Sequence, residues 1–406
     1  MRLLFTICLC IAYSLQGIGQ EYDYLIKGAY LIDAKNEIQD TMDIAVLDGK
    51  IADVARNLLG TNTKKVIDAS GLILSPGLID PHTHVFVGSK SHTFADGFNS
   101  VSPDDFSFRS GVTTVVDAGT SGWRNFETFK TNVIDASKTR VLAFLNIVGV
   151  GMSGNESQEN LSDMQVDKAY ETLKKYPSIL VGIKIGHYTG KDWLPFENAL
   201  KASEKAGKPL LVECHLPEYS LADQLNKMRP GDIITHSFEE IDERLPIIDS
   251  AGSLHPFVKA AYASGINFDV GHGGAGFWFS QAIPAFRQGL APTSFGTDLH
   301  RFSMNSGMKN MLNIMSKFIN IGMPVEDVIA TATWKTAQAI QREDLGHLTV
   351  GAVADLTLSR LHTGDFGFID AGKNKIEGKI KLETELTMKD GKVVYDLNGL
   401  AANQYH

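Results

Sequence analysis

Residues 71–88 read GLILSPGLIDPHTHVFVG and join an apolar run to two histidines, His82 and His84. The run has the composition of a buried β-strand, which the chain enters through Pro76 and Gly77. Side chains at positions i and i+2 of a strand point to the same face, so both imidazoles can bind one metal ion. The stretch therefore predicts a strand that ends in a metal site.

Seven further apolar runs follow, and each precedes polar or helical sequence, which is typical of βα units around a parallel sheet. Eight such units predict an α/β fold, a closed (β/α)₈ TIM barrel. A doubly wound open sheet is disfavoured because no GxGxxG follows the first strand. We expect the seven strands within residues 111–119, 139–149, 178–186, 208–216, 231–238, 266–273 and 291–298, and helices within 166–176, 194–207 and 322–340.

Both ends of the chain have the composition of short β-strands. Asp48-Gly49 and Asp390-Gly391 have the residue types of tight hairpin turns. The simplest architecture joins the two ends into one small β-sandwich domain. We therefore expect a signal peptide at 1–19, the sandwich from 20–75 and 345–406, and the barrel at 76–344.

The first residues have the organisation of a secretory signal peptide. Arg2 precedes an apolar core at 3–15, and Gly17 and Gly19 stand at the −3 and −1 positions of a cleavage site. We expect export to the periplasm or the medium and no membrane association after cleavage. A lipid anchor is disfavoured, because both cysteines of this region lie before the end of the apolar core.

The composition limits the classes of partner. The chain has 406 residues, 43% of them hydrophobic, and a formal net charge of -9. No stretch interleaves basic and aromatic residues, so we expect no nucleic-acid partner. The composition is compatible with a small-molecule substrate. The sequence does not fix the oligomeric state, so a homo-oligomer remains an alternative. After signal cleavage Cys214 is the single cysteine, which excludes an internal disulfide.

Further metal-binding side chains stand where later strands are expected to end, and active sites of (β/α)₈ barrels lie at those ends. A single histidine is more often a hydrogen-bonded core residue, but their common location favours a metal centre. Lys184 lies among apolar residues, either as a snorkelling side chain or as a neutral amine that captures carbon dioxide as a carbamate. The candidate side chains beyond the first strand are Lys184, His215, His236 and Asp298.

These motifs, with PGLIDPHTH at 76–84, GTDLH at 296–300 and GAVADLTL at 351–358, resemble the amidohydrolase superfamily over essentially the whole mature chain. SPDDFSFRSGVTTVVDAG and GDIITHSF resemble its amidohydrolase/deacetylase branch. That resemblance implies two divalent ions, zinc by default, and hydrolysis of N-acetyl-D-amino acids or acetylated 2-hydroxy acids. It places His82, His84 and Asp298 on the more buried metal and His215 and His236 on the other, with carboxylated Lys184 bridging them.

The expected reaction is attack of a metal-bridging hydroxide on an amide or ester carbonyl, with Asp298 as the catalytic base. Candidate substrate-binding residues are Tyr188, His272 and Arg301, although Arg301 would equally pair with an acid. Dihydroorotases carry an arginine two residues past the histidine pair, where this chain has Phe86, which argues against that activity. The alternatives are a mononuclear deaminase, a cyclic amidohydrolase and a non-catalytic barrel scaffold.

Overall fold

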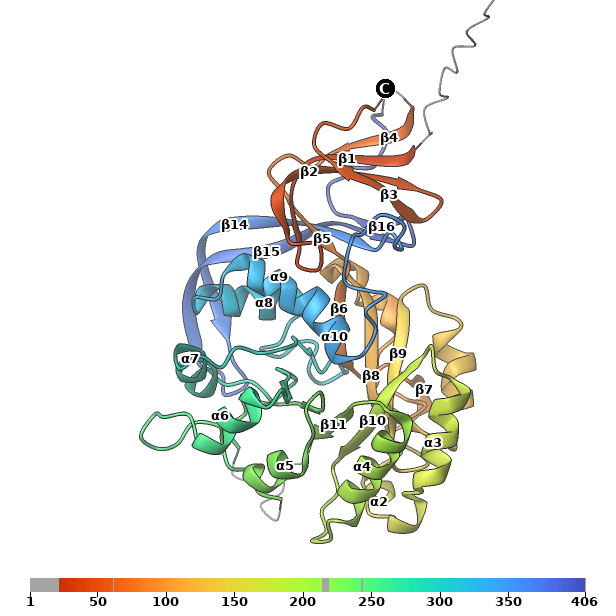
Figure 1. The fold of residues 1–406 in the computed structure, drawn as a ribbon, viewed down its shortest axis with the longest axis vertical. Helices are drawn as coiled ribbons and strands as arrows, with labels where there is room; N and C mark the ends of the chain where they lie inside the picture. The colour runs from red at the N-terminus through yellow and green to blue at the C-terminus, as the bar shows by residue number, and fades with distance from the viewer. Residues whose placement is uncertain (1–21, 61, 214–218, 242–243, 406) are drawn as a thin grey trace, which may run out of the picture.

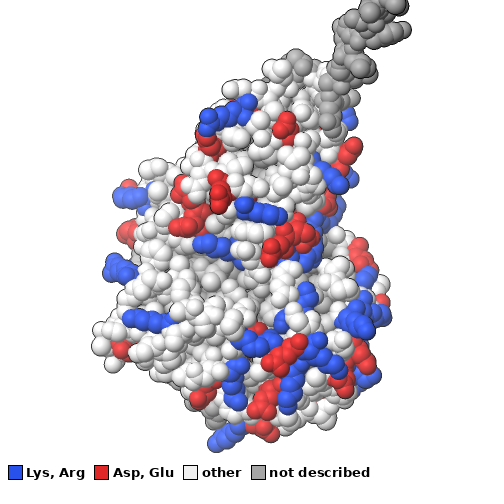
Figure 2. All heavy atoms as spheres, viewed as in Figure 1, with Lys and Arg blue, Asp and Glu red and all other residues white. Residues whose placement is uncertain are grey.

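The computed structural model describes residues 22–60, 62–213, 219–241 and 244–405. The expected signal peptide, Cys214 and His215 lie outside these ranges. A β-sheet body stands at one end of the molecule and the larger α/β body at the other (Figure 1). Lysines and arginines are interspersed with acidic residues over the face drawn in Figure 2.

The α/β body is built on a parallel sheet whose strands run β13-β12-β11-β10-β9-β8-β6. The expected eighth strand forms single parallel bridges instead, Asp269 to Ser294 on one side and Thr83 to Leu299 on the other. These bridges join both edges of the sheet and complete the predicted barrel. Pro292 and Gly296 weaken ladder pairing in this segment. The strands are β6 (Leu78–Thr83), β8 (Val112–Gly122), β9 (Arg140–Asn146), β10 (Leu180–Gly186), β11 (Leu210–Glu213), β12 (Ile233–Ile234) and β13 (Asn267–Phe268).

The three predicted helices are present in the barrel body. Helix α3 (Val166–Lys175) has Asp167 in its first turn and two lysines in its last, which complements the helix dipole. Helix α4 (Leu194–Ala206) ends at Gly207 in the left-handed conformation. Helix α9 (Val325–Ala330) continues through a π-helical turn into α10 (Thr336–Ala339). The other helices of at least seven residues are α5 (Leu221–Lys227), α6 (Pro256–Ala263), α7 (Phe279–Arg287) and α8 (Met311–Asn320).

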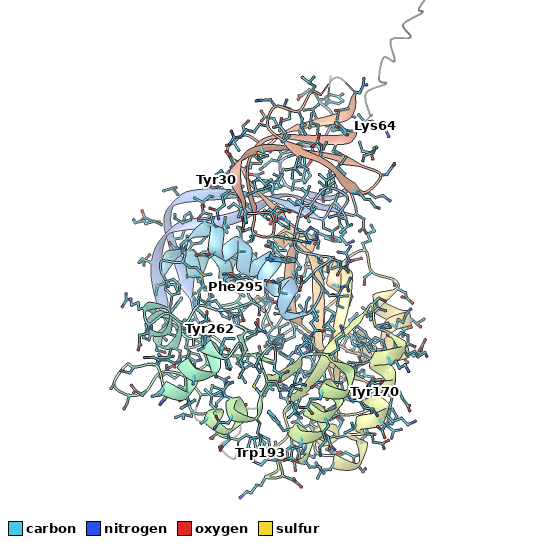
Figure 3. The ribbon with its side chains drawn as sticks, in the orientation of Figure 1. Tyr30, Lys64, Tyr170, Trp193, Tyr262 and Phe295 are labelled. Carbon is cyan, nitrogen blue, oxygen red and sulfur yellow. The ribbon has the colours of Figure 1, made fainter. Side chains whose placement is uncertain are left out.

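Helix α8 packs against the eighth barrel segment. Phe295, from the eighth barrel segment, lies inside this body (Figure 3), and its ring centroid is 5.0 Å from that of Phe318 on α8. No helix in the described ranges is long and apolar enough to cross a membrane. The shorter elements are β7 (Val87–Lys90), α1 (Phe126–Phe129) and α2 (Asn155–Gln158).

The sequence predicted that the two chain ends join in one β-domain. In the structure both ends contribute strands to one eight-stranded sheet. Its order is β16-β15-β14-β5-β1-β2-β3, with β4 paired to β1. Strand β5 connects the two ends, because it is parallel to β1 and antiparallel to β14. The strands are β1 (Tyr22–Asp33), β2 (Ile38–Leu47), β3 (Lys50–Ala55), β4 (Thr63–Asp68), β5 (Ile73–Pro76), β14 (Leu356–Ile369), β15 (Lys375–Lys389) and β16 (Lys392–Asp396).

The stretch 71–88 passes from this sheet into the barrel. Strand β5 ends at Pro76 and β6 begins at Leu78. A side chain on Gly77 would place its Cβ 2.2 Å from Thr113 Oγ1, so only glycine fits at this crossing. Strands β14 and β15 extend along the barrel, where Ser316 Oγ of α8 accepts a hydrogen bond from Leu382 N at 3.0 Å.

Candidate metal centre

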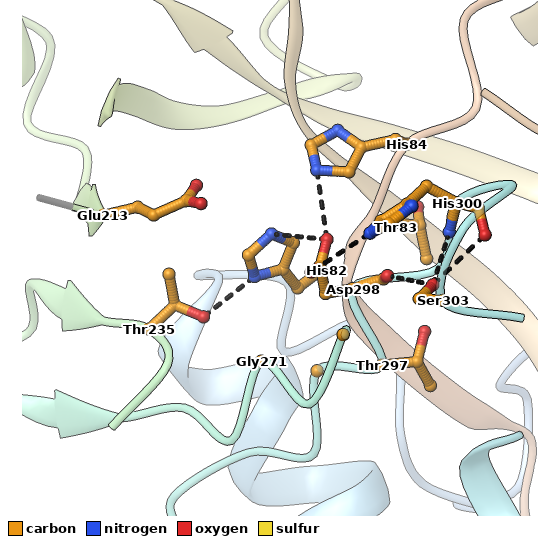
Figure 4. A network of polar contacts seen from close by, with 12 residues as sticks. His82, Thr83, His84, Glu213, Thr235, Gly271, Thr297, Asp298, His300 and Ser303 are labelled. Carbon is orange, nitrogen blue, oxygen red and sulfur yellow. Dashed lines mark hydrogen bonds and ion pairs between the residues drawn. The ribbon is translucent and has the colours of Figure 1, made fainter. Parts of the chain in front are cut away.

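His82 lies at the end of β6 and is held by a short hydrogen-bond chain (Figure 4). Thr235 Oγ1 donates to Asp269 Oδ2 at 2.7 Å, so the same oxygen accepts from His82 Nδ1 at 2.8 Å. This arrangement places the proton on Nδ1 and leaves a lone pair on Nε2. His82 Nε2 is buried and has no hydrogen-bond partner among the described residues. It faces Asp298, whose Oδ1 is 3.5 Å away.

His84 is held in the same way from the neighbouring strand β8. Its Nδ1 is 2.9 Å from Thr120 Oγ1, and Asp117 accepts hydrogen bonds from Thr120 N and Val85 N. Asp117 thus positions Thr120, and burial raises the pKa of the Asp117 carboxyl to about 6. His84 Nε2 is 3.2 Å from Asp298 Oδ1. Burial lowers the pKa of His84 to about 3, so the ring is a neutral ligand at pH 7.

Asp298 stands in the eighth barrel segment and has a backbone φ of 49°, which side-chain-bearing residues rarely adopt. Its N–H donates to His82 O at 2.7 Å. His300 Nε2 lies 3.5 Å from its Oδ2. Burial would raise the pKa of Asp298, but its interactions with His300 and His84 hold that pKa well below its usual value. The side chain is therefore a carboxylate.

A second group of ligand atoms joins His82 to Glu213 and His236, with all three atoms within 4.8 Å of one another. His236 Nδ1 is 2.5 Å from Gly271 O, which can only accept, so Nδ1 carries the proton. His236 Nε2 then faces Glu213 Oε1 at 2.9 Å. Lys184 Nζ contacts the other carboxylate oxygen of Glu213. Burial would raise the pKa of Glu213, but the charges of Lys184, His187 and His236 hold it well below its usual value.

The two groups have the chemistry that a divalent metal requires. His82, His84 and Asp298 form the other set of ligand atoms within 4.8 Å, so His82 belongs to both. Imidazole nitrogens and carboxylate oxygens are suitable ligands for zinc, and the unpartnered Nε2 of His82 is explained by such an ion. The structure brings together His82, His84, His236 and Asp298, with Lys184 in contact through Glu213; His215 lies outside the described residues.

Glu213 was missed by the sequence analysis, which gave the ligand role at this strand to His215. The signal was present, since Glu213 ends the apolar run PLLVE and is 4% exposed. A buried carboxylate at the end of a barrel strand needs a cationic partner. His187 and His300 were also missed, and both lie beside the carboxylates, with His187 Nε2 3.2 Å from Glu213 Oε1.

The three expected substrate-binding residues are not equivalent. His272 is fully buried, and Lys317 Nζ of α8 lies 2.6 Å from its Nε2. Tyr188 is buried, and its ring stacks on that of Tyr219 with centroids 6.3 Å apart. His272 is thus held by a hydrogen bond and Tyr188 by ring packing, and their substrate contacts stay a prediction. Arg301 is exposed, and its backbone N–H donates to Asn99 O at 2.9 Å.

A cavity of about 170 Å³ has two wall residues that contact the ligand groups. The ring of Phe94, in its wall, is 4.9 Å from the His84 ring, and His187 in the same wall reaches Glu213. Among the described residues, no lysine, arginine or acidic side chain lines this space, which suits a small uncharged group. The lining consists of His92, Thr93, Phe94, Asn99, Met152, Gly154, Asn155, Gln158 and His187.

Phe86 occupies the position where dihydroorotases carry an arginine. Its side chain is fully buried, and its ring centroid lies 4.8 Å from that of Phe129. It therefore belongs to the hydrophobic core and presents no group that binds a substrate carboxylate.

Comparison with curated proteins gives relatives that are named deacetylases. The chain is 32% identical over 345 residues to a deacetylase of Agrobacterium fabrum, and the match covers 83% of each chain. It is 30% identical over 345 residues to a deacetylase of Enterococcus faecalis, covering 83% of this chain and 89% of the relative. The model of the Amidohydrolase family matches residues 280–394.

Solved structures agree over nearly the whole chain. A crystal structure described as an adenine deaminase has a TM-score of 0.84 at 28% identity and covers 93% of this chain and 100% of its own. One described as a dihydroorotase has a TM-score of 0.82 at 28% identity, covering 92% and 99%. The barrel and its histidine and carboxylate groups thus define a metal-binding hydrolase of carbon–nitrogen bonds. The chain belongs to the amidohydrolase superfamily.

Proposed function

We propose that this protein is a two-metal deacetylase that hydrolyses the amide or ester bond of small N-acyl amino acids or acylated 2-hydroxy acids. The observation that carries the proposal is the pair of ligand groups that meet at His82, close to a small cavity whose wall residues Phe94 and His187 contact them. The deacetylase names of the relatives support the choice of an acetyl group.

His82, His84 and Asp298 would hold one ion, and His236 and Glu213, whose ligand atoms lie within 4.8 Å of that of His82, would hold the second. Zinc is the ion that this ligand set suits best. When bound, such ions acidify a water molecule and polarise the scissile carbonyl. Two side chains are candidates for an anion shared by both metals, namely Lys184 as a carbamate and Glu213.

Asp298 is the group that moves the proton. Its carboxylate accepts a proton from the attacking water and delivers it to the leaving amine or alkoxide. His82 and His84 keep their Nε2 atoms directed at the Asp298 carboxylate, because threonine hydroxyls fix their other ring nitrogens. The base therefore needs no rearrangement before it acts.

The cavity provides the site for the small acyl group or side chain of the substrate. Arg301 stands beside this cavity, because its backbone is hydrogen-bonded to Asn99 in the lining. An exposed guanidinium at this position would bind a substrate carboxylate as the molecule enters. This places the charged end of the substrate at the rim and the acyl group inside.

The test is a screen of zinc-loaded enzyme against N-acyl-D-amino acids, N-acyl-L-amino acids, acetylated 2-hydroxy acids and cyclic amides, together with metal analysis. We expect about two ions per chain and release of acetate. Turnover of cyclic amides alone, or an absence of bound metal, would contradict the proposal.

The second candidate is a mononuclear deaminase, which the resemblance to a crystal structure described as an adenine deaminase favours. It predicts one ion per chain and release of ammonia from an aminopurine. The bridging anion is not needed in that chemistry, so the close approach of Glu213, His236 and His82 favours the deacetylase.

We propose that residues 1–19 direct export and are removed. Expression of the full chain followed by N-terminal sequencing of the mature protein tests this, with Gln20 as the expected first residue. Recovery of uncleaved protein from the cytoplasm would contradict it.

A further inference from the structure

We propose that the cleft between the first turn of α8 and strand β15 is a binding site for a phosphate group, either free or on a small ester. The cleft has a volume of about 350 Å³. Among the described residues, it shares no lining residue with the cavity beside the metal centre and includes no member of the two ligand groups. The site is therefore additional to the proposed hydrolysis.

Three segments that are distant in the sequence build this cleft. Helix α8 lies along β15 (Figure 1), where Asn320 Oδ1 accepts a hydrogen bond from Ile380 N at 3.1 Å. The single turn Phe108–Ser110 lies against the same strand, because Thr387 Oγ1 donates to Phe108 O at 2.8 Å. These hydrogen bonds hold the walls in place, so the polar groups of the cleft are positioned by the fold.

The first turn of α8 supplies backbone donors to one wall. Met311 and Leu312 begin this ten-residue helix, so their N–H groups have no acceptor within it. Neither N–H has another acceptor among the described residues, whereas Asn313 N donates to Asn310 Oδ1 at 2.8 Å. Leu312 and Asn310 both line the cleft. The free N–H groups and the positive end of the helix dipole favour an anion here.

A buried hydroxyl on the opposite wall has no partner. Thr384 is 2% exposed, and its Oγ1 makes no hydrogen bond with any described residue. Its side chain leaves β15 on the same face as that of Leu382, which packs in the barrel core, so the hydroxyl is directed toward the barrel body. Thr384 also lines the cleft. An unpaired buried hydroxyl is costly, and a phosphate oxygen would accept its hydrogen bond.

Asn313 adds a second unsatisfied group on the helix side of the cleft. Its Oδ1 is buried and has no hydrogen-bond partner among the described residues. Rotation about χ2 exchanges the oxygen and the nitrogen of the amide, which brings two N–H donors to this place. Asn313 and Thr384 line the same space, so one ligand satisfies both side chains.

The charged side chains around the cleft are predominantly cationic. Arg109, Lys309 and Lys381 line it, and neither Arg109 nor Lys309 has an ion-pair partner in the part of the chain that the structure describes. Glu383 is the single acidic side chain among the described lining residues, and Lys381 Nζ at 3.5 Å and His362 Nε2 at 3.0 Å contact it. Two unpaired cations therefore remain for a ligand, in a chain whose formal net charge is -9.

The arrangement of donors favours a phosphate over a carboxylate. A phosphate carries its oxygens in tetrahedral directions and can accept from the helix, the strand and Arg109 at once, whereas a carboxylate offers two oxygens in one plane. The planar guanidinium of Arg109 suits two parallel hydrogen bonds to a phosphate. Tyr395 and Leu397 complete the lining and suit the organic part of a phosphate ester.

Calorimetric titration of the metal-loaded full chain with inorganic phosphate tests the site. We expect saturable binding with a Kd of about 1 mM or lower. Arg109→Gln should raise the Kd about tenfold, and Thr384→Val, which keeps the shape but lacks the hydroxyl, should raise it about fivefold. The matched control is Arg287→Gln, which removes an exposed arginine of α7 outside the cleft and should leave the Kd unchanged.

Two results of this titration would overturn the proposal. Phosphate bound only at the metal centre would have the same affinity in the wild type and in all three variants. A general attraction to positive charge would weaken binding as much in Arg287→Gln as in Arg109→Gln. If Thr384→Val fails to fold, the comparison of the two arginine variants decides, because both side chains are exposed.

Two further probes define the ligand. Acetate should bind about tenfold more weakly than phosphate, and equal affinities would overturn the choice of a phosphate. Phenyl phosphate that binds more tightly than inorganic phosphate, with the same dependence on Arg109, would support a phosphate ester as the ligand. Equal affinities for these two probes, again dependent on Arg109, would support free phosphate.

Discussion

Glu213 and Asp298 lie on opposite sides of His82 (Figure 4), and they differ in whether a buried lysine contacts them. Lys184 contacts Glu213 directly. Lys317 is equally buried, yet it donates to His272 Nε2 at 2.6 Å and to Gly307 O at 2.7 Å. Asp298 is therefore neighboured by histidines instead of by a lysine.

The difference separates two roles for a buried carboxylate. A carboxylate paired with a fixed cation keeps its charge and suits a permanent metal ligand. A carboxylate surrounded by imidazoles, as Asp298 is by His82, His84 and His300, can take up and release a proton during a reaction. In the proposed mechanism Glu213 would only bind metal, whereas Asp298 would bind metal and also move the proton.

The largest effect should come from Asp298→Asn. The amide cannot accept the proton of the attacking water, so we expect kcat to fall by about 10³-fold while bound metal stays largely intact. Glu213→Gln should show the opposite pattern, in which the first effect is a loss of bound metal. Steady-state kinetics and metal analysis on the same preparations make the comparison, and a near wild-type rate for Asp298→Asn would remove it from the catalytic role.

Gly273→Ala tests the position of Asp298 without changing any polar group. The added Cβ would lie 2.0 Å from Asp298 Oδ2, and the φ of +43° disfavours any side chain. We expect a fall of about 10²-fold in kcat, because small displacements of a catalytic group are costly. The matched control is Gly274→Ala, whose Cβ meets nothing within 4 Å. Equal rates for the two variants would contradict the requirement for a residue without a side chain at position 273.

Much of this fold was predictable from local patterns. The apolar runs with Gly and Pro punctuation gave the barrel strands, and the Asp48-Gly49 turn gave a hairpin between β2 and β3. His82 and His84 were identifiable because their spacing matches the two-residue period of a strand. These features depend on neighbours in the sequence.

Other features depend on contacts between distant residues. Glu213 is recognisable as a ligand only when β10 supplies Lys184 and β12 supplies His236 beside it. The role of His272 was proposed from its place after a strand, but its Nε2 faces Lys317, which is 45 residues away on α8. The eighth strand was expected as regular pairing, yet tertiary closure needs only bridges at Ser294 and Leu299.

Lys317→Met sharpens the contrast between the two lysines through the pH dependence of stability. Burial lowers the pKa of Lys317 to about 7, with Asp370 opposing and Lys309 adding to the effect. Between about pH 7 and 10.5 the unfolded chain binds the extra proton, so this group makes the free energy of unfolding rise with pH. The rise is up to about 1 kcal/mol per pH unit.

The variant lacks this contribution, so urea unfolding at pH 7, 8 and 9 should show a shallower rise for Lys317→Met than for wild type. The matched control is Lys309→Met, which removes an exposed lysine from the same region and should keep most of the wild-type slope. Parallel slopes for wild type and Lys317→Met would show that the buried amine is charged in the folded protein.

The smallest effect should come from Arg301→Met, because Arg301 is exposed where Lys184 and Lys317 are buried. Water screens an exposed cation, so its contact with a substrate carboxylate is worth about 1 kcal/mol, or roughly a fivefold rise in KM. The rise should appear for N-acetyl amino acids and be absent for neutral esters of the same acyl group, with kcat unchanged for both. An equal rise in KM for neutral esters would show that the Arg301 side chain shapes the rim without binding charge. The orientation in which the substrate enters would then have to be set by the histidines that line the cavity.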